Sequence, residues 1–196
     1  SDITDYDFHI KNFENIASEL EGYVERCYFS YAIQYGKVKR NFDKFQRENG
    51  VKIADPNDNS KIKLANELAE IAEQYGIEML SCCGDYLLGQ KIKKAHCVDG
   101  KLIEELFYKD GLKYREKPTR KECGCTDSTD IGAYDTCPHG CIYCYANMNK
   151  EKAYKRFEEH DKDAAFLGYT KAEADGWIED IRNKDEKADF KQMKLF

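Results

Sequence analysis

Cysteines are the residues of this 196-residue chain best suited to chemistry, and five of the nine lie between residues 123 and 144. Cys137, Cys141 and Cys144 form a C-x3-C-x2-C pattern with an aromatic residue, Tyr143, directly before the last cysteine. Three thiolates on one tight loop can bind three irons of a [4Fe–4S] cube and leave the fourth iron open, unlike the four-cysteine sites of closed electron carriers. The spacing therefore predicts an iron–sulfur cluster with one iron available to a small molecule.

A structural zinc site is an alternative interpretation of the same loop. Zinc in a structural site takes four ligands and leaves no open position, so the three cysteines would need a fourth donor. His139, inside the pattern, or Cys125 could supply that donor. In this alternative the protein is a non-catalytic zinc or iron–sulfur binding module with a structural or redox role.

A second group of cysteines is spread more widely along the chain. Cys97, Cys123 and Cys125, together with Cys83 or Cys82, offer four thiolates for an auxiliary iron–sulfur cluster or a tetrahedral zinc ion. The spacings match no compact zinc knuckle, so the fold would have to bring these residues together.

The cysteine loop resembles that of the radical S-adenosylmethionine enzymes, which carry three cysteines at this spacing with an aromatic residue at the position of Tyr143. The resemblance implies that the three cysteines bind a [4Fe–4S] cluster whose open iron chelates S-adenosylmethionine. It also implies that Tyr143 lies near the adenine, with His139 as a second residue at the cofactor. One electron, from a donor such as flavodoxin or ferredoxin, would cleave S-adenosylmethionine to a 5′-deoxyadenosyl radical that abstracts hydrogen from a substrate. The protein would then be a radical S-adenosylmethionine enzyme.

A wider resemblance covers nearly the whole chain. The chain combines Cys-Gly-Cys at 123–125, Asp-Ile-Gly at 130–132, Tyr-Asp-Thr-Cys at 134–137, His-Gly-Cys at 139–141 and Tyr-Cys-Tyr-Ala-Asn at 143–147. In this combination it is similar to a bacterial and archaeal family of uncharacterised proteins whose C-terminal cysteines are likened to the radical S-adenosylmethionine cluster. The resemblance implies an architecture and a cofactor, but no substrate.

The elements that must position these cysteines follow an α/β rhythm. Apolar residues at helical spacing predict one helix that begins near Asp7 and another that begins near Ser60, each with that residue as its N-cap. The segments 24–29 and 77–80 are rich in apolar and β-branched residues and are predicted strands. Cys27, in the first strand, is expected to be a small buried hydrophobic residue.

Helices alternating with such strands indicate a parallel sheet. Two strands are too few for a complete (βα)8 barrel, which takes about 250 residues. The chain also begins Ser1-Asp2-Ile3, without a methionine, and both features indicate that an N-terminal part is missing. We expect an α/β protein with a partial (βα) barrel-like portion at 1–110, a cysteine-rich cluster-binding segment at 111–148 and a charged helical extension at 149–196.

Composition and charge exclude several classes of protein. With 41% hydrophobic residues and no long apolar run, the chain is expected to be globular and to make no contact with a membrane. The net charge of −6 argues against a broad nucleic-acid-binding surface, although a basic loop at 113–121 could still make a local contact. No signal-peptide pattern is present, which favours the cytoplasm, where thiols stay reduced and clustered cysteines indicate metal binding or catalysis.

Overall fold

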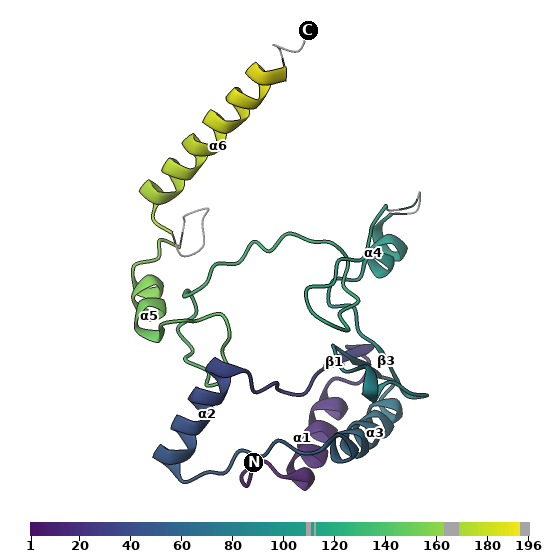
Figure 1. Cartoon of the computed structure of the whole chain (residues 1–196). Helices are drawn as coiled ribbons and strands as arrows, with labels where there is room; N and C mark the ends of the chain where they lie inside the picture. Colours follow the sequence, from purple (N-terminus) through teal and green to yellow (C-terminus); the bar gives the residue numbers. More distant parts are fainter. Residues whose placement is uncertain (109–110, 112, 163–168, 193–196) are drawn as a thin grey trace. The chain divides into compact units, whose positions relative to one another are not determined.

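A three-stranded parallel sheet lies in the N-terminal part of the chain in the computed structural model (Figure 1). Its strands are β1 (Arg26–Phe29), β2 (Glu78–Ser81) and β3 (Ile92–Lys94), paired in that order. The structure describes residues 1–108, 111, 113–162 and 169–192. It divides into two compact units, Ser1–Thr129 and Asp130–Phe196, a division that falls inside the expected cysteine-rich segment 111–148.

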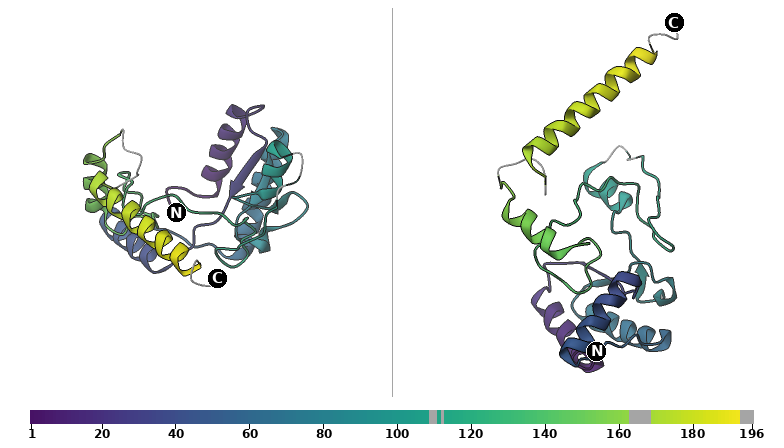
Figure 2. Two further views of the ribbon diagram at one scale, coloured as in Figure 1. Left: turned by 90° about the horizontal axis from the view of Figure 1, so that it is seen from above. Right: turned by 60° about the vertical axis from the view of Figure 1, so that its left-hand side comes forward.

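Two helices pack together against the sheet, α1 (Tyr6–Glu19) and α3 (Asp58–Gln74), and they lie side by side in Figures 1 and 2. Alanines on both helices allow this close contact, because a small side chain lets two backbones approach. Met79 of β2 stands opposite Ile92 of β3 in the register of the sheet, and both are 1% exposed. The buried core of the first unit comprises Ala17, Ala65, Ala69, Ala72, Ile77, Met79, Leu87 and Ile92.

Both of these helices begin earlier than the sequence predicts. The N-cap of α1 is Asp5, not Asp7, and its carboxylate accepts a hydrogen bond from the backbone N–H of Phe8 at 2.8 Å. The N-cap of α3 is Asn57, and Ser60, the expected cap, instead donates its backbone N–H to the Asn57 side chain at 3.0 Å. Asp and Asn are both strong N-caps, so composition alone does not choose among neighbouring candidates.

Three further elements complete the first unit: α2 (Gly36–Asn49), the 3₁₀ helix η1 (Asp85–Leu87) and α4 (Gly100–Phe107). Helix α2 ends at Gly50, whose φ of 67° lies in the left-handed region that glycine adopts without strain. Asp99 caps α4 by accepting a hydrogen bond from the N–H of Leu102 at 3.0 Å. Asp99 therefore fixes the start of the helix that follows β3.

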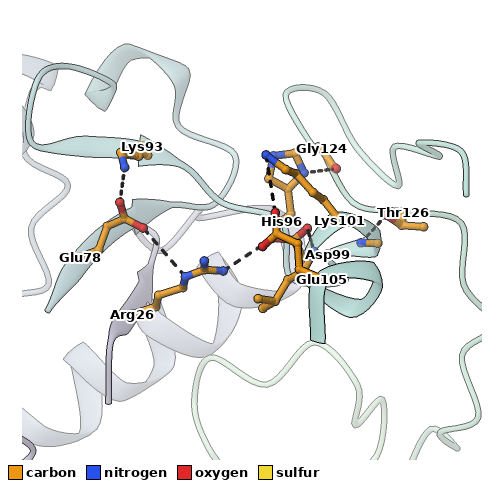
Figure 3. Close-up of polar contacts among 11 residues, drawn as sticks. Arg26, Glu78, Lys93, His96, Asp99, Lys101, Glu105, Gly124 and Thr126 are labelled. Atoms are coloured by element: carbon orange, nitrogen blue, oxygen red, sulfur yellow. Dashed lines mark hydrogen bonds and ion pairs between the residues drawn. The ribbon is translucent and has the colours of Figure 1, made fainter. Parts of the chain in front are cut away.

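An ion-pair network joins the sheet to this cap (Figure 3). The guanidinium of Arg26 lies 3.9 Å from Glu78 Oε2 and 3.9 Å from Asp99 Oδ2, and Glu78 also contacts Lys93. The network thus links β1, β2, β3 and the start of α4. Because the side chains of Arg26 and Glu78 are each about one-third exposed, these pairs orient the elements more than they stabilise them.

Among the described residues of the second unit are the helices α5 (Lys150–Glu158) and α6 (Lys171–Gln192), in the charged stretch where helices are expected. Asn149 caps α5 by accepting a hydrogen bond from the N–H of Lys152 at 2.9 Å. No helix in the described residues is long and apolar enough to cross a membrane.

The mixed α/β class and the parallel sheet are confirmed, but a barrel-like arrangement is not shown. The strand β3 was not predicted. Its sequence is only Ile-Lys-Lys, so no alternation of apolar and polar residues marks it, and pairing with β2 alone makes it a strand.

Candidate metal centres

The three cysteines of the C-x3-C-x2-C pattern lie on a loop, residues 135–149, that we call the cluster loop. Asp135 closes it: its Oδ1 accepts hydrogen bonds from the backbone N–H groups of Met148 at 2.5 Å and Asn149 at 2.9 Å. Its own N–H donates to the carbonyl of Ala146 at 3.1 Å. The N–H of Asn149, together with that of Met148, holds the pKa of the Asp135 carboxyl below its usual range. The loop is therefore tied at its ends by a carboxylate that stays ionised.

Asn147 holds the interior of the cluster loop. Its side chain is buried, with the residue 4% exposed, and its Nδ2 donates to the carbonyl of Cys137 at 2.6 Å. Its backbone N–H donates to Cys144 Sγ at 3.3 Å. Within the described part of the chain, its buried Oδ1 has no hydrogen-bond partner. A buried polar atom left unpaired is costly, so this oxygen is suited to a group that binds in the loop.

All three cysteines of the loop are free thiols; those of Cys137 and Cys141 belong to exposed residues and that of Cys144 to a half-buried one. The Nδ1 atom of His139 lies 3.3 Å from Cys137 Sγ. Gly140, at φ 64°, makes the turn between the first two cysteines, a conformation that glycine favours. Tyr143 is half-buried. The loop thus presents thiols at its surface while its backbone is fixed from inside.

The structure also brings cysteines together in the first unit. β2 ends at Ser81, directly before Cys82, and β3 ends three residues before Cys97. The two strands are parallel, and the N–H of Ala95 continues their pairing by donating to the carbonyl of Ser81 at 2.9 Å. As a result, Cys82 Sγ and Cys97 Sγ lie 3.5 Å apart at the carboxyl edge of the sheet.

A short hairpin, residues 115–127, supplies two more thiols to this edge. Its arms are joined by an antiparallel bridge between Glu116 and Thr126 and by a 2.9 Å hydrogen bond from the N–H of Lys117 to the carbonyl of Cys125. The N–H of Thr126 donates to the carbonyl of Val98 at 2.9 Å. Backbone hydrogen bonds thus hold the hairpin, with its Cys-Gly-Cys segment, next to the residues that follow β3.

Gly124 allows the closest approach of the hairpin. Its carbonyl contacts Nδ1 of His96, as Figure 3 shows. A Cβ at this position would lie 2.8 Å from Cε1 of the same ring, closer than real Cβ atoms come to a carbon. The glycine between Cys123 and Cys125 is therefore required by the packing of the hairpin on His96.

Four cysteines gather at this edge of the sheet. Cys97 Sγ lies 3.5 Å from Cys82 Sγ, and burial, with the neighbouring thiols of Cys82 and Cys125, raises the pKa of the Cys97 thiol. We call Cys82, Cys97, Cys123 and Cys125 the edge cysteines. Cys123 is buried, and the backbone N–H groups of Cys125 and Thr119, which bond to its sulfur, lower the pKa of its thiol to about 6. This thiol therefore ionises more readily than an ordinary cysteine.

Arg120 adds a positive charge to the edge. Its Nε donates to Cys83 Sγ at 2.9 Å and its Nη2 lies 3.4 Å from Cys82 Sγ. Cys83 has a φ of 55°, in the left-handed region, and this turn directs its sulfur to the guanidinium. Of the two adjacent cysteines considered from the sequence, Cys82 is therefore the one in contact with Cys97.

A cavity of about 220 Å³ lies beside Cys82 and Cys83, at the carboxyl ends of β1 and β2. Tyr31, Lys61 and Tyr86 line it. Lys61 Nζ pairs with Asp55 Oδ1 at 3.0 Å. Asp58 also lines the cavity, so its wall carries more negative than positive charge. Cys27, in contrast, packs against the core but is half-buried, not fully buried as expected, and burial raises the pKa of its thiol.

Neither group of thiols is already arranged around one point: in the residues that the structure describes, no three Cys, His, Asp or Glu side chains form a metal-binding arrangement. What the fold does supply is proximity. The cluster loop carries three free thiols with a fixed backbone, and the sheet edge gathers the edge cysteines, of which Cys82 and Cys97 have their sulfurs 3.5 Å apart.

Residues 1–146 match the family described as "Domain of unknown function (DUF1848)". The chain belongs to this family. The matched region of DUF1848 contains all nine cysteines, so both the cluster loop thiols and the edge cysteines lie within it. No curated protein and no solved structure matches the chain. The expectation of an uncharacterised family is confirmed, and the resemblance to radical S-adenosylmethionine enzymes stays a prediction.

Several residues that shape these sites were missed from the DUF1848 sequence. Asp135 lies just before the first cysteine of the cluster loop, and no role in closing that loop was predicted for it. Asn147 was not singled out, although its position three residues after the last cysteine is a usable signal. Arg120 was considered only as part of a basic loop, because the contact with Cys83 spans 37 residues.

Proposed function

We propose that this protein is an iron–sulfur protein resembling the radical S-adenosylmethionine enzymes. Cys137, Cys141 and Cys144 would hold a [4Fe–4S] cluster with one iron left open. The observation that carries the proposal is the cluster loop itself: three free thiols on one short segment whose backbone is closed by Asp135. This donor set of soft thiolates fits iron–sulfur clusters.

Two further contacts support the fit. Asn147 donates its backbone N–H to Cys144 Sγ, and hydrogen bonds to ligand sulfurs are one of the means by which proteins set the potential of a cluster. The unpaired, buried Oδ1 of Asn147 offers an acceptor on the inner side of the loop. Cys137 and Cys141 belong to exposed residues, so a small molecule and an electron donor could both reach this face.

When bound, the cluster would supply one electron for the reductive cleavage of S-adenosylmethionine. The chain's own residues would hold and orient the reactants. Lys150 donates its ammonium group to the carbonyl of Gly140 at 2.7 Å, which fixes the turn between Cys137 and Cys141. His139 and Tyr143, on the same loop, would contact the cofactor.

The fold of residues 1–110, the location of the protein and its electron donor belong to the same proposal. The barrel-like arrangement of residues 1–110 is supported by three parallel strands that neighbour one another in sequence order, as successive strands of a barrel do. A cytoplasmic location and a flavodoxin-like or ferredoxin-like electron donor would follow from the chemistry.

Anaerobic reconstitution of the full chain with iron and sulfide tests the proposal. About four irons should bind at the loop, and S-adenosylmethionine should alter the electron paramagnetic resonance signal of the reduced protein and give 5′-deoxyadenosine. Cys141→Ala should lose both properties, whereas Cys27→Ala, a matched change at a core cysteine, should keep them. A wild-type protein that binds iron and sulfide with no spectral response to S-adenosylmethionine would contradict the catalytic part.

A non-catalytic zinc site is a second candidate, and one contact favours it. His139 Nδ1 lies 3.3 Å from Cys137 Sγ, so the loop can offer three sulfurs and one nitrogen, a common structural zinc set. Zinc analysis separates the two candidates. A colourless protein that holds one zinc per chain in the loop, and that loses it in His139→Ala, would support this alternative and refute the iron–sulfur cluster.

A further inference from the structure

We propose that a zinc ion binds at the carboxyl edge of the sheet, separately from the cluster loop, with four thiolates as its ligands. These ligands are the edge cysteines, Cys82, Cys97, Cys123 and Cys125. The site would join the hairpin 115–127 to the ends of β2 and β3.

The sulfur contacts favour one metal ion over a cluster. Thiolates on one tetrahedral zinc, with zinc–sulfur bonds of about 2.3 Å, lie about 3.8 Å from one another. The sulfurs of Cys82 and Cys97 are 3.5 Å apart. In a [4Fe–4S] cube each cysteine binds its own iron, which holds the sulfurs well beyond contact. The distance between Cys82 and Cys97 is therefore that of two ligands on one metal ion.

Cys82, and not its neighbour Cys83, is the ligand from the end of β2. The sulfur of Cys83 accepts a hydrogen bond from Arg120 Nε at 2.9 Å and lies 3.9 Å from that of Cys82. The sulfur of Cys82 also lies 3.4 Å from Arg120 Nη2, but it is placed 3.5 Å from Cys97 Sγ. Cys83 therefore provides a matched control.

The charges at the edge suit thiolate ligands. Four thiolates around one Zn²⁺ carry a net charge of −2, and this charge needs nearby donors. The guanidinium of Arg120 lies within 3.4 Å of Cys82 Sγ. The hydroxyl of Thr119 donates to Cys123 Sγ at 3.6 Å, in addition to the backbone donors at that sulfur. Cys82 and Cys123 therefore each have their own hydrogen-bond donors.

Backbone hydrogen bonds hold together the segments that carry the ligands. The hairpin is held to the sheet by the Thr126–Val98 hydrogen bond, and the carboxylate of Glu122 accepts from the N–H of Asp85 at 3.0 Å. Because no three thiols of the described chain yet surround one point, the sulfurs would gather around the ion by rotation about χ1. Such rotations join staggered states and leave the backbone unchanged.

The test uses the full chain with Cys137, Cys141 and Cys144 all replaced by serine, so its outcome does not depend on the cluster loop. One zinc per chain should bind to this triple variant when its thiols are reduced, and cobalt should give the visible absorption of a tetrahedral thiolate site. Zinc should protect the four edge cysteines from alkylation by N-ethylmaleimide, as read by mass spectrometry. This readout requires no further variant and so does not depend on whether a variant folds.

Single substitutions in the same background sharpen the test. Cys97→Ser and Cys125→Ser should each weaken zinc binding at least about tenfold, whereas Cys83→Ser and Cys27→Ser should change it less than about twofold. The proposal is overturned if Cys83 is protected in place of Cys82, if the background protein binds no zinc, or if it takes up iron and sulfide as a cluster instead.

Discussion

Replacing Asp135 with alanine should open the cluster loop. The carboxylate of this buried residue accepts two backbone hydrogen bonds, from Met148 and Asn149, at one oxygen. A hydrogen bond to a charged group contributes about 1.5–3 kcal/mol, and two bonds that share an atom are not additive. We therefore expect the free energy of opening the loop to fall by about 3 kcal/mol in Asp135→Ala.

Asp135→Asn is the matched control. The amide oxygen of asparagine can still accept from both N–H groups, and asparagine tolerates the left-handed φ of 56° found at this position. Only the charge is lost, so we expect the free energy of opening to fall by about 1 kcal/mol.

Hydrogen exchange at the amides of Met148 and Asn149 measures this opening directly. A loss of about 3 kcal/mol corresponds to roughly 100-fold faster exchange, while amides in α3, in the other unit, should be unaffected. If these two amides exchanged at the wild-type rate in Asp135→Ala, the carboxylate would not be what closes the loop, and the reasoning would be refuted.

The same carboxylate gives the loop a pH dependence of known sign. The folded-state pKa of Asp135 is lowered, chiefly by the N–H of Asn149. The carboxylate therefore stabilises the closed loop fully at any pH above the pKa of an unfolded aspartate, about 3.9. This stabilisation is lost as pH falls through the lowered folded pKa. Protection of the Asn149 amide should therefore be constant near neutral pH and decline only in acid, and this decline should be absent in Asp135→Asn.

Three other substitutions test the first unit, each by urea unfolding unless stated. Met79→Ala should lower the free energy of unfolding by about 2–5 kcal/mol, because its side chain is 1% exposed at the centre of the core; a loss below about 1 kcal/mol would mean that this core is loosely packed. Gly124→Ala should lower the free energy of unfolding by about 1–3 kcal/mol, because its new Cβ contacts the ring of His96. Adding His96→Ala to this variant should recover part of the lost stability. No recovery would mean that the strain lies elsewhere. Asp99→Ala should lower the free energy of unfolding by about 1 kcal/mol, because the cap bond to Leu102 is lost, and the Leu102 amide should exchange faster. Asp99→Ser should keep the cap. Equal losses of stability in the two variants would argue against capping.

Much of the fold could be predicted from local patterns. Helices α1 and α3 carry apolar residues at helical spacing, and β1 and β2 are short apolar runs between turns, so each is visible in a window of a few residues. The exact caps were less predictable, because several suitable residues stand close together: Asp5 and Asp7 compete at α1, and Asn57 and Ser60 at α3.

The parts that could not be predicted depend on contacts distant in sequence. β3 is a strand because β2 lies beside it, and its two lysines hide it from any local pattern. For the candidate sites, residue types and spacing identified the cysteines, but the choice between Cys82 and Cys83 depends on which sulfur faces Cys97, because Arg120 contacts both. Only the fold decides that orientation.

The docking of the hairpin 115–127 has a consequence for how the chain is made. The contact between Asp85 and Glu122 spans 37 residues, and contacts of such separation form slowly because the intervening chain must first be closed into a loop. A ribosome adds about 5–20 residues per second, so Cys82 and Cys97 emerge on the order of seconds before Cys123 and Cys125. During that interval the sheet edge displays the thiols of Cys82, Cys83 and Cys97 before Arg120, which contacts the first two, has been added to the chain.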